Sequence, residues 1–213
     1  MLWFGWFGFN AGSALGANDL AALAFGTTNT ASASAAIAWI FYDMARGRKP
    51  TAMGFCIGAV VGLVAITPAA GFVTLGASVV IGALSAVVSR IVVDLKSKTS
   101  IDDTLDVFPC HGVGGLMGMI LTGVFAKEVG LVAGPTSTFY KHLIAMVLVG
   151  SFSFCGAYLL YKLTDLISPL RVTAEDEEIG LDISQHLESI DNGPATVSQV
   201  PQHVVGKSAL SFL

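Results

Sequence analysis

Long apolar runs alternate with short polar segments along most of this sequence. A helix needs roughly 20 apolar residues to cross a bilayer core of about 30 Å. Five runs come close to that length, and one run at the start of the chain is shorter. The pattern predicts six helices, at about 1–16, 19–42, 52–72, 74–93, 105–125 and 140–163. We therefore expect an all-α fold, a polytopic membrane helix bundle over residues 1–163.

Small residues are frequent inside these runs, as in the alternating alanines and serines of residues 31–36. Lipid tails are as apolar as the helices, so helices associate in a bilayer through close backbone approach at glycine, alanine and serine. The small residues therefore predict helices that pack on one another at several faces.

Charged side chains make up 12% of the 213 residues, whereas soluble domains carry about 25%. Residues 164–213 hold eight acids and two bases, and the rest of the chain holds seven acids and nine bases. We therefore predict a nearly neutral apolar body followed by an acidic tail at 164–213. The absence of a basic patch in the sequence argues against a nucleic-acid partner.

Lysine and arginine placement predicts the orientation, because cytoplasmic loops carry an excess of these residues. If the turn at 43–51 is cytoplasmic, alternation places the loop at 94–104 and the tail on the same side. That side then holds Arg46, Arg48, Lys49, Arg90, Lys96, Lys98, Lys162 and Arg171. The opposite side holds only Lys127 and Lys141 in the apolar body. We expect an integral protein of the plasma membrane with a cytoplasmic C-terminus.

The first run is short and opens directly with Met1-Leu2-Trp3-Phe4, without a polar flank. It is too short to cross a bilayer unaided. It also lacks the basic region and cleavage site of a signal peptide. We therefore expect that upstream sequence is missing and that the chain is an N-terminally truncated form.

The three cysteines, Cys56, Cys110 and Cys155, lie far apart inside apolar runs. We interpret them as buried small hydrophobic residues without a disulfide. The sequence shows no metal-ligand spacing, no phosphate-binding loop and no Ser-His-Asp set. We therefore expect no metal, no cofactor and no enzymatic activity.

One histidine, His111, falls within the first two turns of an apolar run, where polar groups are costly and are often functional. A neutral imidazole offers one hydrogen-bond donor and one acceptor, which suits the handling of protons or amines. Gly115 and Gly118 lie one and two turns further on the same face, so a neighbouring helix can approach there. The alternative is that His111 merely bonds a neighbouring helix, and its spacing does not decide between the two.

A second candidate cluster lies in the first run, where Trp6, Phe9 and Ser13 share one helix face. Aromatic rings with a nearby hydroxyl can hold a small cation by cation–π contact and hydrogen bonding. Aromatic stripes are also common packing surfaces, so the spacing leaves both interpretations open.

Four motifs resemble those of one membrane family, the ammonium transporters (Amt, Mep and Rh proteins). Gly5–Ala14 resembles the sixth-helix motif of that family, and Gly62–Gly71 its eighth-helix motif. Asp106–Gly115, followed by Leu121–Phe125, resembles the tenth helix, and Gly180-Leu181-Asp182 resembles the cytoplasmic tail motif. The matches occur in family order and at family spacing over about residues 1–188.

The resemblance implies eleven helices in a complete protein, with helices one to five and six to ten forming an inverted repeat. The six predicted helices then look like helices six to eleven, that is, the second repeat plus a final helix. His111 resembles the second of two pore histidines, Phe9 a gate phenylalanine, and Ser13 a hydroxyl of the outer recruitment site. Trp6 and Val107 resemble residues of the pore wall.

The resemblance also assigns structural and regulatory roles. Asp106, Gly114 and Gly115 look like structural residues of the tenth helix. Gly180, Leu181 and Asp182 look like the regulatory tail, to which a PII-type signalling protein could bind. The tail departs from the family where His186-Leu187-Glu188 replaces His-Gly-Glu, and 189–213 reads as a polar, disordered end. We interpret His142 as an interfacial residue.

The function implied is transport of ammonium or ammonia across a bilayer through an apolar pore with a histidine relay, in a homotrimer. The first pore histidine, the fifth-helix aspartate and the second gate phenylalanine would precede Met1, so we expect the truncated form to be inactive alone. Alternatives are a non-transporting ammonium sensor or a dominant-negative subunit on the same scaffold. An unrelated carrier is a further alternative, but it would call for another charged residue at the membrane midplane.

Overall fold

A computed structural model describes residues 1–189 and 193–194 of the chain. The chain divides into two compact units, Met1–Ser151 and Phe152–Leu213. The disordered end predicted at 189–213 lies outside the described residues, apart from Ser189, Gly193 and Pro194.

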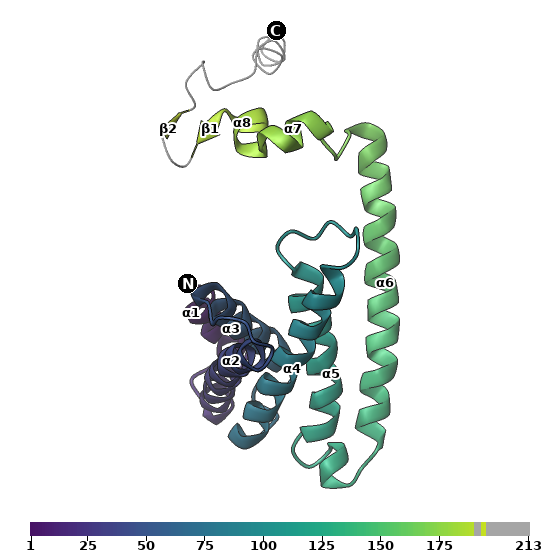
Figure 1. The fold of residues 1–213 in the computed structure, drawn as a ribbon. Coiled ribbons are helices and arrows are strands. Elements are labelled where there is room, and N and C mark those ends of the chain that lie inside the picture. Colours follow the sequence, from purple (N-terminus) through teal and green to yellow (C-terminus); the bar gives the residue numbers. More distant parts are fainter. Residues whose placement is uncertain (190–192, 195–213) are drawn as a thin grey trace. The chain divides into compact units, whose positions relative to one another are not determined.

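The first unit is a bundle of helices, and Figure 1 shows α1 to α5 packed together. Its elements are α1 (Leu2–Gly12), α2 (Asp19–Ala45), α3 (Ala52–Ile66), α4 (Leu75–Lys96), the π-helix η1 (Phe108–Val113), α5 (Gly114–Phe125) and the 3₁₀ turn η2 (Leu131–Ala133). The helix α6 (Ser137–Ile167) begins in the first unit and continues into the second.

The helix ends follow from local chemistry. Asn18, Thr51 and Thr74 are N-caps, and each side-chain oxygen accepts a hydrogen bond from the backbone N–H three residues later. The helix predicted at 52–72 ends at Ile66, because Pro68 lacks an N–H and its ring blocks continuation. Residues 67–72 form tight turns instead, with the N–H of Phe72 bonded to Ala69 O.

Small residues let α2 lie against α3 and α4. Ala31, Ala35 and Ala36 are fully buried. A Cβ atom on Gly62 of α3 would lie 2.5 Å from the carbonyl oxygen of Ala31, a separation that real Cβ atoms do not reach. The close helix packing expected from the sequence is therefore present in α2 and α3.

The long helix α2 also buries hydroxyl groups. Thr27, Thr28 and Ser32 are fully buried. The hydroxyls of Thr27 and Thr28 bond to carbonyls in the preceding turn, and that of Ser32 bonds to Ala59 O of α3 at 3.0 Å. The hydroxyls are thus satisfied inside the bundle, as a low-dielectric environment requires.

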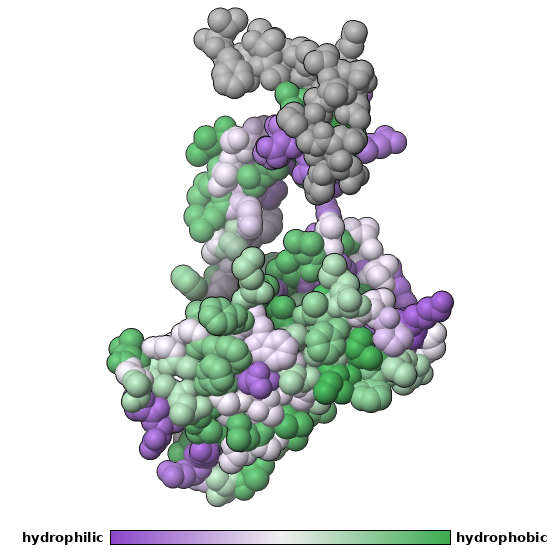
Figure 2. Space-filling model, turned by 90° about the vertical axis from the view of Figure 1, so that its left-hand side faces the viewer, coloured by the Kyte–Doolittle hydropathy of each residue, from purple (hydrophilic) through white to green (hydrophobic). Residues whose placement is uncertain are grey.

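Among the described residues, three helices are long and apolar enough to cross a membrane: Leu75–Lys96, Phe108–Phe125 and Ser137–Ile167. Helix α3 is apolar but shorter. Large apolar side chains are also exposed over the helices, as Figure 2 shows for one face. Exposed apolar surface of this extent is typical of a lipid or partner interface.

The second unit contains the end of α6 and two short helices, α7 (Ala174–Ile179) and α8 (Leu181–His186). Thr173 caps α7, and Gly180 separates the two helices with a φ of 100°. A two-residue antiparallel pair, β1 (Glu188–Ser189) with β2 (Gly193–Pro194), follows; Glu188 pairs with Pro194 and Ser189 with Gly193. Apart from this pair, the described fold is helical, as predicted.

Candidate functional site

The aromatic face predicted on α1 is held by a hydrogen bond that Trp6 donates to Thr67, the residue at the end of α3. Trp6 Nε1 donates to Thr67 Oγ1 at 2.9 Å, and that hydroxyl donates to Leu63 O at 2.8 Å. The rings of Trp6 and Phe9 meet edge to face, with centroids 5.8 Å apart. Thr67 therefore fixes the indole, a role that its sequence position does not reveal.

The hydroxyl of Ser13, at the end of α1, donates to Phe9 O at 2.6 Å. Both residues are exposed in this chain. The proton of Ser13 is thus committed to the backbone, and its oxygen lone pairs remain available as acceptors. An open apolar hollow of about 410 Å³ lies on the same helix, lined by Met1, Leu2, Gly5, Trp6 and Phe9.

Two further contacts fix α1 on α2. The buried Asn10 donates from Nδ2 to Thr28 Oγ1 at 2.9 Å. The rings of Phe7 and Phe25 stack with centroids 4.0 Å apart. Asn10 and Phe7 therefore hold the helix that carries this aromatic face against α2.

His111 lies in the π-helical turn η1 at the start of the helix that continues as α5. Pro109 and Cys110 are buried, whereas His111, Val107 and Phe108 are exposed. In residues 1–189, no hydrogen bond or ion pair is found at the imidazole. π-Helical turns inside α-helices occur frequently at functional sites. The turn thus presents an unpartnered imidazole on an apolar surface.

The start of this turn is anchored by charged groups. The Asp103 carboxylate accepts from the N–H groups of Val107 and Phe108 at 2.8 and 2.9 Å. Lys96 Nζ lies 2.5 Å from Asp106 Oδ1 and also donates to the carbonyl oxygen of Asp103. Asp106 has a φ of 53°, which is uncommon for a residue with a side chain.

The glycines of the tenth-helix motif differ in how closely α3 approaches them. A Cβ atom would lie 3.5 Å from Val64 Cγ1 at Gly114 and 4.0 Å from it at Gly115, which are ordinary contacts. At Gly118 it would collide with the backbone of Ala65. The sequence predicts that a neighbouring helix approaches at Gly115 and Gly118. In the structure α3 comes closest at Gly118.

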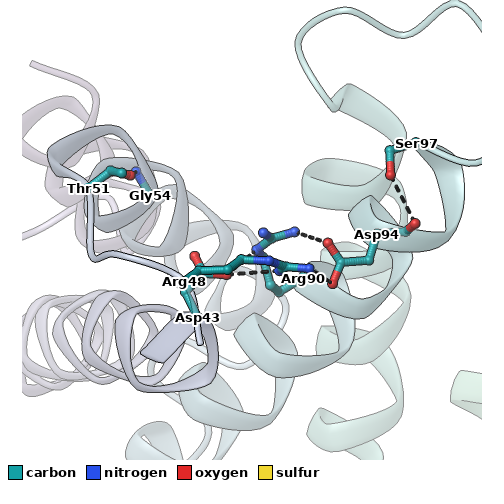
Figure 3. Close-up of polar contacts among 7 residues, drawn as sticks. All are labelled: Asp43, Arg48, Thr51, Gly54, Arg90, Asp94 and Ser97. Atoms are coloured by element: carbon teal, nitrogen blue, oxygen red, sulfur yellow. Dashed lines mark hydrogen bonds and ion pairs between the residues drawn. The ribbon is translucent and has the colours of Figure 1, made fainter. Parts of the chain in front are cut away.

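A network of four charges lies where α2, the α2–α3 turn and α4 meet, as Figure 3 shows. Asp43 accepts from Arg48 at 3.1 Å and from Arg90 at 2.8 Å. Asp94 accepts from the same two residues at 2.8 and 2.5 Å. The Arg90 guanidinium also lies 5.5 Å from the ring centre of Trp39. Two acids and two bases thus neutralise one another at the end of the bundle.

Three residues of secondary interest have these surroundings. His142 Nδ1 lies 3.1 Å from Met119 O, so this histidine contacts α5. Among the cysteines, Cys110 is buried, but Cys56 and Cys155 are exposed, contrary to the expectation that all three are buried. Cys56 and Cys155 lie on helix faces that no other described residues cover.

The tail motif lies in the second unit, at the junction of α7 and α8. Gly180 provides the positive φ, Leu181 is half exposed, and Asp182 lies in the first turn of α8. Arg171 Nε pairs with Glu177 Oε1 at 2.7 Å just before this junction.

The structure does not join all the predicted site residues directly. Helix α3 contacts both α1 and η1. Within residues 1–189 no hydrogen bond or ring contact links His111 to Trp6, Phe9 or Ser13. In the described residues, no three His, Cys, Asp or Glu side chains are placed to hold a metal ion.

Long apolar helices and a large exposed apolar surface define an integral α-helical membrane protein. The model of the Ammonium Transporter Family matches residues 1–190, and the chain belongs to this family. The family model and the curated relatives are described as transporters, which confirms the expectation that the chain is not an enzyme.

The relatives agree in sequence and in structure. The ammonium transporter of Bacillus subtilis is 44% identical over 194 residues, which cover 87% of this chain and 48% of that protein. The crystal structure of Candida albicans Mep2 matches with a TM-score of 0.77 at 34% identity, over 82% of this chain and 42% of Mep2. A structure described as a sensor Amt protein matches with a TM-score of 0.78 at 32% identity, over 87% of this chain and 47% of that one. These likenesses confirm the predicted fold class.

The chain spans about half the length of the curated relatives that it matches.

Proposed function

We propose that this chain forms one half of a pore through which ammonium nitrogen crosses a membrane, with His111 lining the pore. The observation that carries the proposal is the exposed, unpartnered imidazole of His111 on an apolar membrane helix. A polar group there is costly unless it meets another polar group or a passing ligand. Family membership supports ammonium as that ligand.

The chemistry follows from the cost of desolvation. Moving a bare cation into a medium of low dielectric constant costs tens of kcal/mol by Born reasoning, and titratable groups avoid this cost by becoming neutral. An apolar pore therefore favours ammonia over ammonium. A neutral imidazole can donate a hydrogen bond to ammonia or accept one from it, and it can take part in moving the separated proton.

The residues of α1 fit the outer part of this path. The Ser13 oxygen keeps its acceptor capacity because its proton is bonded to Phe9 O. The aromatic faces of Trp6 and Phe9 can stabilise a cation by cation–π contact before it loses its proton. We assign Ser13 to recruitment, Phe9 to the gate, and Trp6 with Val107 to the pore wall.

The test is a fusion of this chain behind the N-terminal half of the Bacillus subtilis transporter, assayed for methylammonium uptake. We expect the fusion to transport and the isolated chain not to transport. His111→Ala should abolish uptake or change its selectivity against potassium, whereas His142→Ala, a matched control, should keep both. Uptake with unchanged selectivity in His111→Ala would overturn the assignment.

We further propose that the intact protein is a homotrimer in the plasma membrane with a cytoplasmic tail that regulates it. The motif Gly180-Leu181-Asp182 would contact neighbouring subunits or a PII-type protein. Deletion of 172–213 from the fusion should change the rate of uptake or its regulation. A deletion that leaves both unchanged would count against a regulatory tail.

A second candidate is a non-transporting ammonium sensor, or a dominant-negative subunit, on the same scaffold. The likeness to a structure described as a sensor Amt protein supports the sensor as a candidate. A sensor fusion would bind methylammonium without accumulating it. A dominant-negative chain would lower uptake when it is co-expressed with an intact transporter.

A further inference from the structure

Two side chains that contact the segment leading into η1, Asp103 and Lys96, have no role in the pore as proposed so far. We propose that both are positioning residues for His111: they hold the π-helical turn that places its imidazole. This inference rests on the proposed function, since it concerns the same imidazole.

The first step is the capping of the turn. The leading N–H groups of a helix have no carbonyl partners within it. Asp103 satisfies two of them, with one carboxylate oxygen on Val107 N and the other on Phe108 N. The next residue, Pro109, has no N–H to satisfy. Asp103 thus accounts for every donor at the start of the turn, although it lies four residues before Val107.

The second step is the link to α4. Lys96, the last residue of α4, bonds both to the carboxylate of Asp106 and to the carbonyl of Asp103. Asp106 N also donates to Asp103 O at 3.1 Å. A residue with positive φ persists where the surrounding contacts fix it, and these contacts fix Asp106. Lys96 therefore ties the strained residue before η1 to a packed helix.

The third step leads from this anchor to the imidazole. Cys110 N donates to Asp106 O at 3.0 Å, and Cys110 directly precedes His111. Pro109 and Cys110 are buried, so they fix the rotation of the turn. No polar side chain bonds to the imidazole itself in residues 1–189. The position of His111 therefore follows from that of the backbone turn.

The charge on Asp103 is maintained across the neutral range. Partial burial opposes ionisation, but the N–H groups of Phe108 and Val107 and the nearby Lys96 hold the pKa of Asp103 below its ordinary value. A carboxyl group with a depressed pKa contributes stability above its unfolded pKa, about 3.9, and loses it at lower pH. The cap is therefore charged at any pH at which transport is assayed.

The first experiment measures hydrogen–deuterium exchange of residues 107–113 in the solubilised chain. Loss of an N-cap shifts the balance between an ordered and a frayed turn by roughly tenfold. We expect Asp103→Ala to accelerate exchange of these residues roughly tenfold and Lys96→Met to accelerate it less. Asp103→Asn should exchange at a rate between those of Asp103→Ala and the wild type. Asp102→Ala, the same change one residue earlier, should exchange like the wild type. Equal exchange in Asp103→Ala and Asp102→Ala would overturn the proposal.

The second experiment uses the fusion described above, at equal amounts in the membrane. Asp103→Ala should shift the selectivity against potassium toward that of His111→Ala. Lys96→Met should lose part of this selectivity, and Lys96→Arg should restore it. If the unmodified fusion does not transport, the proposed function fails. The hydrogen–deuterium exchange experiment then still tests whether Asp103 caps the turn. If His111→Ala changes selectivity but Asp103→Ala and Lys96→Met behave like Asp102→Ala, the positioning inference alone is wrong.

Discussion

At the scale of single residues, Trp6 owes its position to a threonine 61 residues away. The side chain of Thr67 accepts from the indole and donates to its own helix, so it joins α1 to the end of α3. A half-buried N–H without its acceptor loses the free energy of that hydrogen bond.

We predict that Thr67→Val, which keeps the shape of the side chain, destabilises the chain by about 1 kcal/mol. Trp6→Phe removes the donor of the same bond. The double variant should therefore show a coupling energy of about 1 kcal/mol relative to the sum of the single variants. The measurement is unfolding in detergent, and strictly additive losses would contradict the bond.

Sequence patterns identified Trp6 and His111 but not the residues that hold them. Trp6 stood out because an aromatic face is visible at helical spacing, and His111 because an imidazole is rare in an apolar run. Thr67 and Asp103 escaped notice because their partners depend on how the chain turns. Threonine before proline and aspartate in a polar loop are common in any helix connection. The signal available for Asp103 was its place shortly before a helix start, where N-caps are favoured.

At the scale of elements, the charge network joins α2, its following turn and α4 without a net charge. Both arginines contact both acids, but the Arg90 side chain is 13% exposed and the Arg48 side chain 39%. Removing one partner of a buried pair leaves an uncompensated charge and costs more than removing an exposed partner.

We therefore expect Arg90→Ala to lower the free energy of unfolding by about 3 kcal/mol, and Arg48→Ala to lower it distinctly less. Thermal unfolding of the two purified variants in one detergent compares them directly. Equal losses would show that burial does not determine the strength of this network.

The crossing of α3 and α5 depends on Gly118. A Cβ atom there would strike the Ala65 backbone, which cannot move aside as a flexible side chain can. We predict that Gly118→Ala costs about 1–3 kcal/mol through overpacking.

Gly115→Ala is the matched control, because its Cβ atom would lie 4.0 Å from Val64 Cγ1. It should unfold like the unmodified chain. If the control is the more damaging of the two, the packing of α3 on α5 differs from that described.

The six helices lie within or near the predicted ranges because apolar runs, caps and prolines are local signals. The observed helix ends differ from the predicted ones where a specific contact determines them. Helix α3 ends before Pro68, and the helix predicted at 105–125 begins at Phe108, whose N–H bonds to Asp103. The π-helical form of η1 was not predicted. It leaves no mark in hydrophobic spacing over six residues.

At the scale of the whole molecule, the bundle and the tail are separate compact units with different chemistry. The tail is acidic, and in its described part Thr173 caps α7 and Arg171 forms an exposed ion pair with Glu177. The hydrogen bond from Arg171 holds the pKa of Glu177 below its ordinary value, although desolvation opposes it.

The Glu177 carboxylate should therefore stabilise α7 above its ordinary pKa, about 4.3, and stop doing so as the pH falls through its lower folded value. We expect the helicity of residues 174–179, followed by NMR on the full chain, to be constant from pH 8 to 5 and to fall below about pH 4. In Arg171→Gln this fall should shift to higher pH. An unchanged midpoint would contradict the pairing.

The π-helical turn has a consequence for any chain that lacks it. Such a turn closes its hydrogen bonds one residue later than an α-turn, so it holds one additional residue. Deleting one position within 108–113 would remove that residue and leave an α-turn, in which Gly118 can keep its contact with Ala65. A deletion before His111 leaves it seven residues from Gly118, whereas a deletion after His111 leaves it six and turns the imidazole by about 100° relative to Gly118. A deletion after His111 is therefore expected to displace the imidazole, although no functional side chain has been replaced.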